Sequence, residues 1–444
     1  MASAAGVPRD QRIPRRLPSG NGPDLQVMPA YDEPGVVRRA QVVDLARSVP
    51  LGVLLPLETS VLLTIAVKHF DASWWEKWLV AAGNGVGLLL APLVTSVARR
   101  RGRPVMLLAG ALAALGAAGL VVASLGAMAL FVIGSVVAIA TVNVVYPLTT
   151  ATYERNFPPT ELGRRVGLGM SLKVLVSALV GLGMGWFLTE YPDRWWMILA
   201  GSAVFGLLLA VLSLQVPSEP LPRVDGVGTT ALPHFHLLRE DRRLRVVLIA
   251  WMLMGFGNLM LLPLRVEYLA QPRYGIDATA GLIVVLTVVI PSAVRLAAMP
   301  LFGLVFDRVR FFTSRIVVNL VFALYVAAFF TGTGMTGLVA GAVLLGVGSA
   351  GGDLMWSLWV TKFSPPGRTA DYMGLHTFFT GIRAFLAPLI GFAVLGHVSL
   401  GLVAVGAALL MVVSSLVLAP EARAEWRDSA ADDPAGLAAV TAGR

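Results

Sequence analysis

Long apolar segments alternate with short polar ones along most of this chain. A segment of about 20 apolar residues is long enough to cross the hydrocarbon core of a bilayer as a helix. The pattern predicts twelve such spans, at 49–68, 77–98, 104–124, 127–149, 166–188, 194–215, 245–268, 278–304, 315–334, 336–360, 372–395 and 398–419. The polar stretches at 125–126 and 335 leave room only for tight hairpins. The sequence therefore predicts an all-α polytopic membrane protein.

Composition supports the same class. Of the 444 residues, 56% are hydrophobic and 14% are charged, whereas a soluble domain carries about 25% charged residues. The absence of cysteine excludes disulfides and thiol chemistry. Two linker histidines, His234 and His236, have no acidic or cysteine neighbours, so we expect no metal. No Walker loop and no cofactor motif is present, so neither ATP drive nor a cofactor is expected.

The net charge of +9 comes from basic residues that gather in alternate loops. That alternation favours orientation in a membrane over nucleic-acid binding, and the positive-inside rule places both termini in the cytoplasm. We therefore expect a multi-pass protein of the cytoplasmic membrane, in contact with lipid and no nucleic acid. The predicted divisions are a tail and juxtamembrane segment (1–48), a first bundle (49–215), a linker (216–244), a second bundle (245–419) and a tail (420–444).

Two loops, one in each half of the chain, carry related charges. The eighth predicted span contains Gly303 near its end, and Asp307 and Arg308 follow it. Arg99, Arg100, Gly102 and Arg103 follow the second span at the corresponding place. Both resemble the signature loop of the major facilitator superfamily, Gly-x-x-x-Asp-Arg-x-Gly-Arg. The earlier copy lacks the Gly and the Asp, and the later copy lacks the trailing Gly-Arg.

This resemblance implies a duplicated architecture. Six spans, a polar linker and six more spans fit two pseudo-symmetric six-helix bundles, which is the parallel-repeat arrangement of that superfamily. The segment 177–181 in span five also parallels 387–391 in span eleven. A major facilitator fold with twelve transmembrane helices, acting as a monomer, is the expectation.

Polar groups inside the spans mark the expected solute pathway. A charge near the bilayer centre costs several kcal/mol unless it faces a cavity or a partner. Eight candidates lie well inside spans: Glu58, Asn84, Asn143, Lys173, Asn258, Arg295, Asp353 and Arg383. All fall on the eight spans that line or flank the central cavity in the resembled family, and none falls on spans three, six, nine or twelve. This partition favours a solute pathway over scattered structural charges.

The chemistry of these groups leaves two interpretations open. The charges could simply pair and hold helices together, for example Glu58 with Lys173 or Arg383. Alternatively, three bases against two acids suit a solute that bears a carboxylate or phosphate, because Arg binds such groups through two parallel hydrogen bonds. In that case Glu58 and Asp353 are the candidate proton carriers.

The charged loops suggest a cytoplasmic gate. In the resembled family the loop Asp holds the two halves together while the pathway opens outward. The expected pairs are Asp307 with Arg164 or Arg165, and Arg99 with Asp371, with reversed polarity. The double substitution Arg99→Asp/Asp371→Arg is expected to retain transport that either single change loses. The competing explanation is that these are surface charges that only obey the positive-inside rule.

The resulting functional prediction is secondary active transport of a small organic solute, coupled to protons, by alternating access. A multidrug or metabolite/proton efflux antiporter is the first alternative. Span four lacks the Arg, and span five the Gly-Pro, that drug exporters of the superfamily usually carry. A non-transporting membrane sensor or scaffold is the second alternative. An enzyme is not expected, because the loops show no cluster of reactive groups.

Overall fold

The computed structural model describes residues 33, 35–158, 160–221, 235–308, 310–364 and 369–432, except for the side chains at 303–308, 354, 357–358, 361–363, 369–371 and 428–432. Across these ranges the secondary structure is helical, with no strand. Twelve helical stretches are long and apolar enough to cross a membrane. The predicted fold class and number of spans are therefore confirmed.

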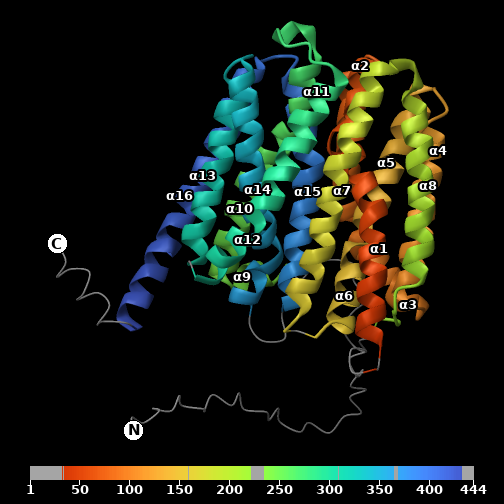
Figure 1. The fold of residues 1–444 in the computed structure, drawn as a ribbon. Helices are drawn as coiled ribbons and strands as arrows, with labels where there is room; N and C mark the ends of the chain where they lie inside the picture. Colours follow the sequence, from red (N-terminus) through yellow and green to blue (C-terminus); the bar gives the residue numbers. More distant parts are fainter. Residues whose placement is uncertain are drawn as a thin grey trace, which may run out of the picture.

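The first six spans are built from eight α-helices and one π-helical turn (Figure 1). Their bounds are α1 Val36–Pro56, a π-helical turn Leu57–Val61, α2 Leu62–Lys68, α3 Trp74–Arg101, α4 Val105–Ala123, α5 Met128–Val144, α6 Tyr146–Asn156, α7 Leu162–Glu190 and α8 Trp195–Leu214. Spans one and four are each a helix in two pieces, α1 with α2 and α5 with α6.

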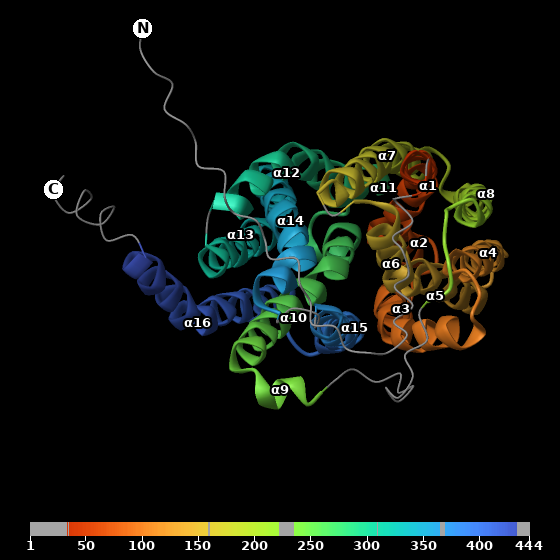
Figure 2. The ribbon, with the colours of Figure 1, turned by 90° about the horizontal axis from the view of Figure 1, so that it is seen from below.

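The second six spans follow a short helix, α9. The bounds are α9 Leu237–Glu240, α10 Arg242–Ala270, α11 Ala280–Val284, a π-helical turn Val285–Val289, α12 Ile290–Arg308, α13 Phe311–Phe330, α14 Met335–Phe363, α15 Thr369–Val394 and α16 Leu400–Asp432. Seen along the helix axes, α1–α8 lie on one side of the molecule and α10–α16 on the other (Figure 2). We call the end at which α1 begins and α16 ends the termini face, and the other end the opposite face.

Several boundaries differ from the prediction, each for a local reason. The juxtamembrane helix expected before residue 49 is continuous with span one, so α1 begins at Val36. The charged residues at 239–243 are shared between α9, which ends at Glu240, and α10, which begins at Arg242. The Asp241 side chain, between the two helices, accepts a hydrogen bond from the N–H of Leu244 and so starts α10. Capping of a free N–H in this way stabilises a helix start by about 1 kcal/mol.

The last helix also extends past the predicted end of span twelve. The Glu425 carboxylate accepts hydrogen bonds from the N–H groups of Phe311 and Phe312, at 3.0 and 3.2 Å. These two donors belong to the first turn of α13, which starts four residues before its predicted position. Trp426 lies against the Arg310 guanidinium, 3.6 Å from the ring centre. The end of α16 therefore packs on the start of α13.

Two pairs of helices bring the bundles together. At Gly85 of α3, a Cβ would lie 2.5 Å from the backbone N of Phe385 in α15. At Gly185 of α7, a Cβ would lie 2.9 Å from Val284 in α11. Only glycine permits approaches this close between helix backbones, as is common in membrane helix interfaces. Spans two and eleven, and spans five and eight, thus form the two pseudo-symmetric contacts between the halves.

Candidate functional site

The carboxylate of Glu58 is the centre of a polar cluster in the first bundle. It lies in the π-helical turn between α1 and α2, a local irregularity that often marks functional positions. Asn84 of α3 donates a hydrogen bond to Glu58 Oε1 at 2.6 Å. Asn143 of α5 also interacts with this carboxylate. The structure therefore brings together three predicted residues from spans one, two and four.

A glycine makes this convergence possible. At Gly87, one turn after Asn84 on α3, a Cβ would lie 2.5 Å from the carbonyl oxygen of Ala140 and 2.9 Å from the Cβ of Asn143. Any larger residue at position 87 would separate α3 from α5 at the level of the cluster. Close helix packing and the position of the two amides thus have the same local cause.

Lys173 of α7 lies within electrostatic range of groups in both bundles. The charges that act on it are Arg295, Glu58, Asp353 and Asp44. Within the described part of the chain, Lys173 forms neither an ion pair nor a hydrogen bond. Its ammonium group is therefore influenced by three carboxylates and one other cation, without a direct contact to any of them among the described residues.

The second bundle supplies that second cation as half of an ion pair. Arg295 of α12 and Asp353 of α14 lie 2.6 Å apart, between Nη2 and Oδ2. Their side chains are 23% and 42% exposed, so solvent reaches both. Two of the predicted charges of spans eight and ten are thus paired across neighbouring helices. A guanidinium has five donors, so Arg295 can bind a further acceptor.

An aromatic pair joins the two bundles beside these charges. The rings of Tyr146 in α6 and Trp356 in α14 meet edge to face, with centroids 6.0 Å apart. Tyr146 also lies within electrostatic range of Glu58, Asp353 and Arg295. Sequence reasoning missed Tyr146, because an aromatic residue in a span is usually a lipid-facing or core residue.

Two predicted pathway residues lie apart from this cluster. Arg383 is only 4% exposed and donates hydrogen bonds to the carbonyl oxygen of Trp251 and to Thr380 Oγ1. No carboxylate is among the groups that act on it. Asn258 of α10 has a buried Oδ1 without a hydrogen-bond partner. The geometry gives neither residue a contact with Glu58, Lys173, Arg295 or Asp353.

The predicted gate residues lie at the termini face. Arg99, Arg100 and Arg103 are exposed at the end of α3 and the turn that follows, where Gly102 adopts a left-handed conformation with φ 58°. Arg164 is exposed, and Arg165 pairs with Glu161 at 2.6 Å. The side chains at 303–308, including Asp307 and Arg308, and that of Asp371, lie outside the described residues. Gly303 belongs to α12, and the expected pairing of the two halves stays a prediction.

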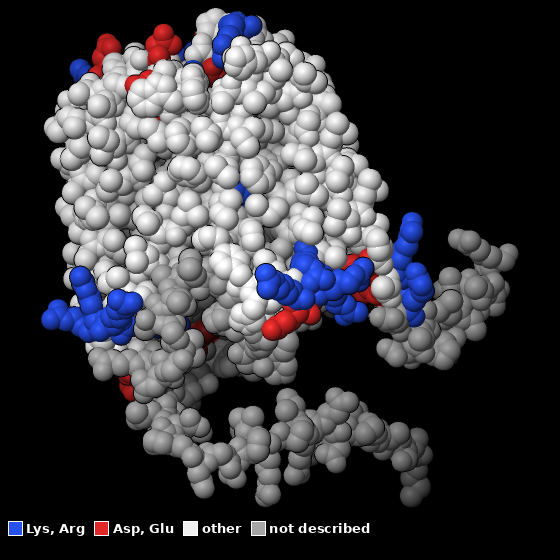
Figure 3. Space-filling model, turned by 180° about the vertical axis from the view of Figure 1, so that it is seen from behind, with Lys and Arg blue, Asp and Glu red and all other residues white. Residues whose placement is uncertain are grey.

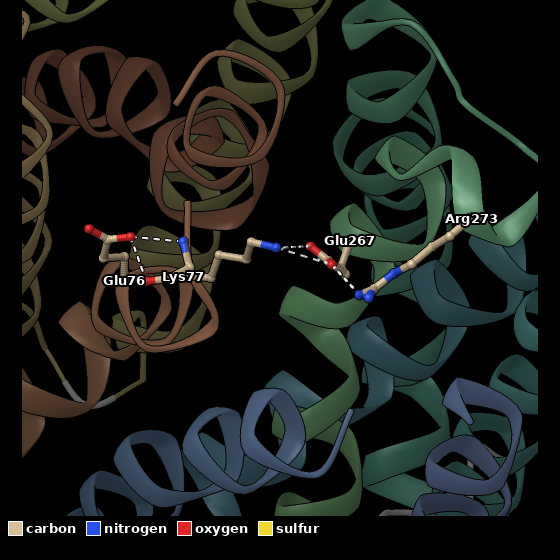
Figure 4. Close-up of polar contacts among 5 residues, drawn as sticks. Glu76, Lys77, Glu267 and Arg273 are labelled. Atoms are coloured by element: carbon tan, nitrogen blue, oxygen red, sulfur yellow. Dashed lines mark hydrogen bonds and ion pairs between the residues drawn. The ribbon is translucent and has the colours of Figure 1, made fainter. Parts of the chain in front are cut away.

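At the opposite face, an ion triad around a buried carboxylate joins the bundles (Figure 4). Lys77 of α3 lies 2.9 Å from Glu267 of α10, between Nζ and Oε2. Arg273, in the loop after α10, donates to Oε1 of the same carboxylate at 2.7 Å. The Glu267 side chain is 2% exposed and that of Lys77 is 9% exposed. We call these three residues the opposite-face lock.

Further contacts between the bundles lie on the same side. An exposed pair joins Lys68 to Asp277 at 2.6 Å. Nearer the centre, Thr287 donates to Ser60 Oγ at 2.8 Å. Trp78 donates from Nε1 to the carbonyl oxygen of Phe385 at 3.1 Å. Among the described residues, every hydrogen bond and ion pair that joins the two bundles lies between the level of Ser60 and the opposite face. The molecule is therefore closed there.

Sequence reasoning missed the opposite-face lock for a clear reason. Lys77 and Glu267 each lie at the end of a predicted span, where a charge beside the polar headgroup region is ordinary. Only their separation in space, across two bundles, distinguishes them from such residues. Trp78, the residue after Lys77, likewise reaches the other bundle, because its indole N–H donates to α15.

Charge on the molecular surface is unevenly distributed. Lys and Arg gather at the termini face, whereas the opposite face carries a mixture of both signs (Figure 3). The exposed basic residues at the termini face include Arg99, Arg100, Arg101, Arg103, Arg239, Arg243 and Arg423. This is the asymmetry that the loop pattern predicted.

Comparison with known proteins gives a single family. The family model of the Major Facilitator Superfamily matches residues 51–388. None of the curated proteins compared with the chain matches it.

Solved structures of transporters have the same fold. The xylose transporter XylE from E. coli, in a partially occluded inward-open conformation, has a TM-score of 0.62 and 15% identity, covering 86% of this chain and 97% of its own. The nucleoside transporter NupG has a TM-score of 0.59 and 14% identity, covering 88% and 99%. The human organic anion transporter TETRAN has a TM-score of 0.59 and 17% identity, covering 86% and 98%. At these identities the likeness concerns the fold alone.

Proposed function

The chain belongs to the Major Facilitator Superfamily, and we propose that it is a proton-coupled secondary transporter of a small organic anion. The observation that carries the proposal is the arrangement of Lys173 and Arg295. Two cations from opposite bundles act on each other, and Lys173 has no direct partner among the described residues. A carboxylate or phosphate group bound between them would compensate Lys173 and accept hydrogen bonds from the further donors of Arg295, whose charge Asp353 already pairs.

The solute would thereby connect the two halves. Alternating access requires that a site between the bundles be exposed to each side in turn. An anion held by Lys173 of α7 and Arg295 of α12 would draw together two helices that belong to different bundles. Tyr146 and Trp356, which meet across the same interface, would contact the apolar part of the solute.

Coupling to protons follows from the position of Glu58. While Glu58 is ionised, it partly compensates the charge of Lys173. Protonation would remove that compensation and strengthen the attraction between Lys173 and an anion. Couplings between two sites are typically about 1–3 kcal/mol, or roughly 5–150-fold in affinity. The expected sign is tighter anion binding as the pH falls, which is the behaviour of an anion/proton symporter.

Orientation and state complete the proposal. Basic residues gather at the termini face, so the positive-inside rule places that face in the cytoplasm. The opposite face is closed by the lock and its neighbouring contacts. The structure would then be a form that is closed to the outside. The gate pairs predicted at the termini face would form when the molecule opens to the outside.

The test is binding and exchange of a panel of small organic anions, cations and neutral solutes by the purified chain in proteoliposomes. An anion should compete in the panel, and Lys173→Met or Arg295→Met should each lower its affinity at least tenfold. Arg194→Met is the matched control, because Arg194 is an exposed arginine at the opposite face that contacts Tyr191. Selection of organic cations, or equal effects of all three variants, would contradict the proposal.

A further inference from the structure

A second cluster of cations lies inside the C-terminal bundle, around one indole ring. Arg315 of α13 and Arg383 of α15 are 2% and 4% exposed. Their guanidinium carbons lie 3.7 and 5.8 Å from the ring centre of Trp251 in α10. Two buried guanidinium groups thus lie near the same indole ring, and the three side chains come from three different helices.

No negative charge compensates them within the described part of the chain. The charged group that acts on Arg315 is Arg383, a like charge. Both terminal nitrogens of Arg315 and the Nε of Arg383 are buried without a hydrogen-bond partner. The face of Trp251 offers a cation–π contact, which compensates a desolvated guanidinium only in part. Isolated buried charges are strongly unfavourable, so a further partner is expected.

The surrounding side chains add more unpaired donors. His376 of α15 is 1% exposed and packs against the rings of Trp251, Trp356 and Trp359, at centroid distances of 5.0, 5.4 and 5.3 Å. The indole N–H groups of Trp251 and Trp359 are buried and have no acceptor among the described residues. Buried donors are almost always satisfied in folded proteins, and each one left unpaired is costly. Among the described residues, the unpaired donors of this cluster outnumber its unpaired acceptors.

The position of Arg383 in this cluster has a local cause. At Gly255 of α10, a Cβ would lie 2.5 Å from both Cδ and Nε of Arg383. The absence of a side chain at 255 therefore leaves the space that the Arg383 side chain occupies. Its contact with α10 is completed by the hydrogen bond to the carbonyl oxygen of Trp251.

We propose that this cluster binds a small monovalent inorganic anion, such as chloride, between Arg315 and Arg383 beside Trp251. The anion would accept the unpaired guanidinium and indole N–H groups and compensate the buried positive charge. Three tryptophan rings border the cluster, and such apolar walls favour a small, weakly hydrated anion over sulfate or phosphate. The site is held by the C-terminal bundle alone.

This site is distinct from the proposed solute site. The ring of Trp356 contacts both Tyr146 and His376, with centroid distances of 6.0 and 5.4 Å, and so links the two clusters. The anion would be a structural counter-ion that stabilises α10, α13 and α15 against one another. The proposal does not depend on which solute the protein carries or on coupling to protons.

A bridging water is the competing explanation. Asn319, one turn after Arg315 on α13, has a buried Oδ1 without a partner, while its amide nitrogen donates to Ser414 Oγ at 3.0 Å. A water between Arg315 and Asn319 would satisfy one donor and one acceptor. It would compensate no charge, and the stability of the protein would then not depend on the anion in solution.

The test is thermal unfolding of the purified full-length chain in detergent, in sodium chloride or sodium gluconate of equal ionic strength. Chloride should raise the Tm along a saturable curve in the native protein and in the Arg194→Met control. Arg315→Met should remove the saturable rise, leaving only the general salt effect. The same saturable rise in Arg315→Met, or no difference between the two salts in the native protein, would overturn the proposal.

A direct measurement protects the test against a variant that does not fold. Equilibrium dialysis of the native chain against radioactive chloride should show one retained ion per chain, displaced by bromide and not by gluconate. Absence of retained chloride would contradict the proposal whatever the variants do. Loss of retention in Gly255→Ala, whose new Cβ must displace the Arg383 side chain, would place the ion at this cluster.

Discussion

Removing the carboxylate of the opposite-face lock should open that face. In Glu267→Gln, Lys77 keeps its charge but loses its ion pair while its side chain is only 9% exposed. Breaking a buried pair by removing one partner costs about 3–5 kcal/mol. When that face opens, water hydrates the Lys77 ammonium group and the new amide at position 267, and the cost disappears. The closed form should therefore lose about 3 kcal/mol relative to the open one, roughly a hundredfold in population.

The chain itself provides a clean assay, because it contains no cysteine. Ser60 is 1% exposed and bonded to Thr287 across the bundles, so a cysteine at this position reports whether the opposite face is open. We expect Ser60→Cys to react slowly with a membrane-impermeant maleimide added at the opposite face. In the Glu267→Gln background the reaction should be up to about a hundredfold faster, in proportion to the open population.

The control is the second ion pair at the same face. Asp277, paired with Lys68, has a side chain that is 59% exposed. Exposed ion pairs contribute about 0–1 kcal/mol, so Asp277→Asn should change the labelling rate less than about fivefold. Equal rates in the Glu267→Gln background and in the native background would refute the reasoning, and so would an equal effect of Asp277→Asn.

Two further predictions concern stability and packing. Tyr153 donates a hydrogen bond at 2.6 Å to Asp44, whose side chain is buried in α1 beside Arg47. Tyr153→Phe should therefore destabilise the protein by about 1–3 kcal/mol and lower its Tm. An unchanged Tm would show that water replaces the bond. Gly85→Val should lower the Tm and weaken solute exchange in proteoliposomes, because its Cβ would lie 2.5 Å from the backbone of Phe385. Full solute exchange in that variant would show that α3 and α15 can separate freely.

Sequence reasoning predicted the spans, and it also selected polar residues that the structure brings together. Inside a bilayer a polar side chain is too costly to remain alone, so Glu58, Asn84 and Asn143 had to meet something polar. They meet one another in the structure. Arg295 and Asp353 likewise form a pair. The number of helices followed from apolar length, which the bilayer thickness imposes.

The burial of charged residues near helix ends could not be predicted in this way. Arg315 was placed at the edge of span nine, where a solvated charge is ordinary, but α13 begins at Phe311 and buries it. The cause lies more than a hundred positions away, because Glu425 caps the first turn of α13. Arg383 lies deep in span eleven as predicted, yet it faces Trp251 within its own bundle. Depth in a span does not determine the direction of a side chain.

The most direct test of the account is solute-dependent proton movement by the chain reconstituted in proteoliposomes. With the anion selected from the panel, the native protein should move protons together with the solute. Glu58→Gln, which mimics the protonated carboxyl, should bind and exchange the anion while moving no protons, and Asp353→Asn should retain proton movement. Proton movement that survives Glu58→Gln and fails in Asp353→Asn would place the proton on span ten and contradict the coupling proposed here.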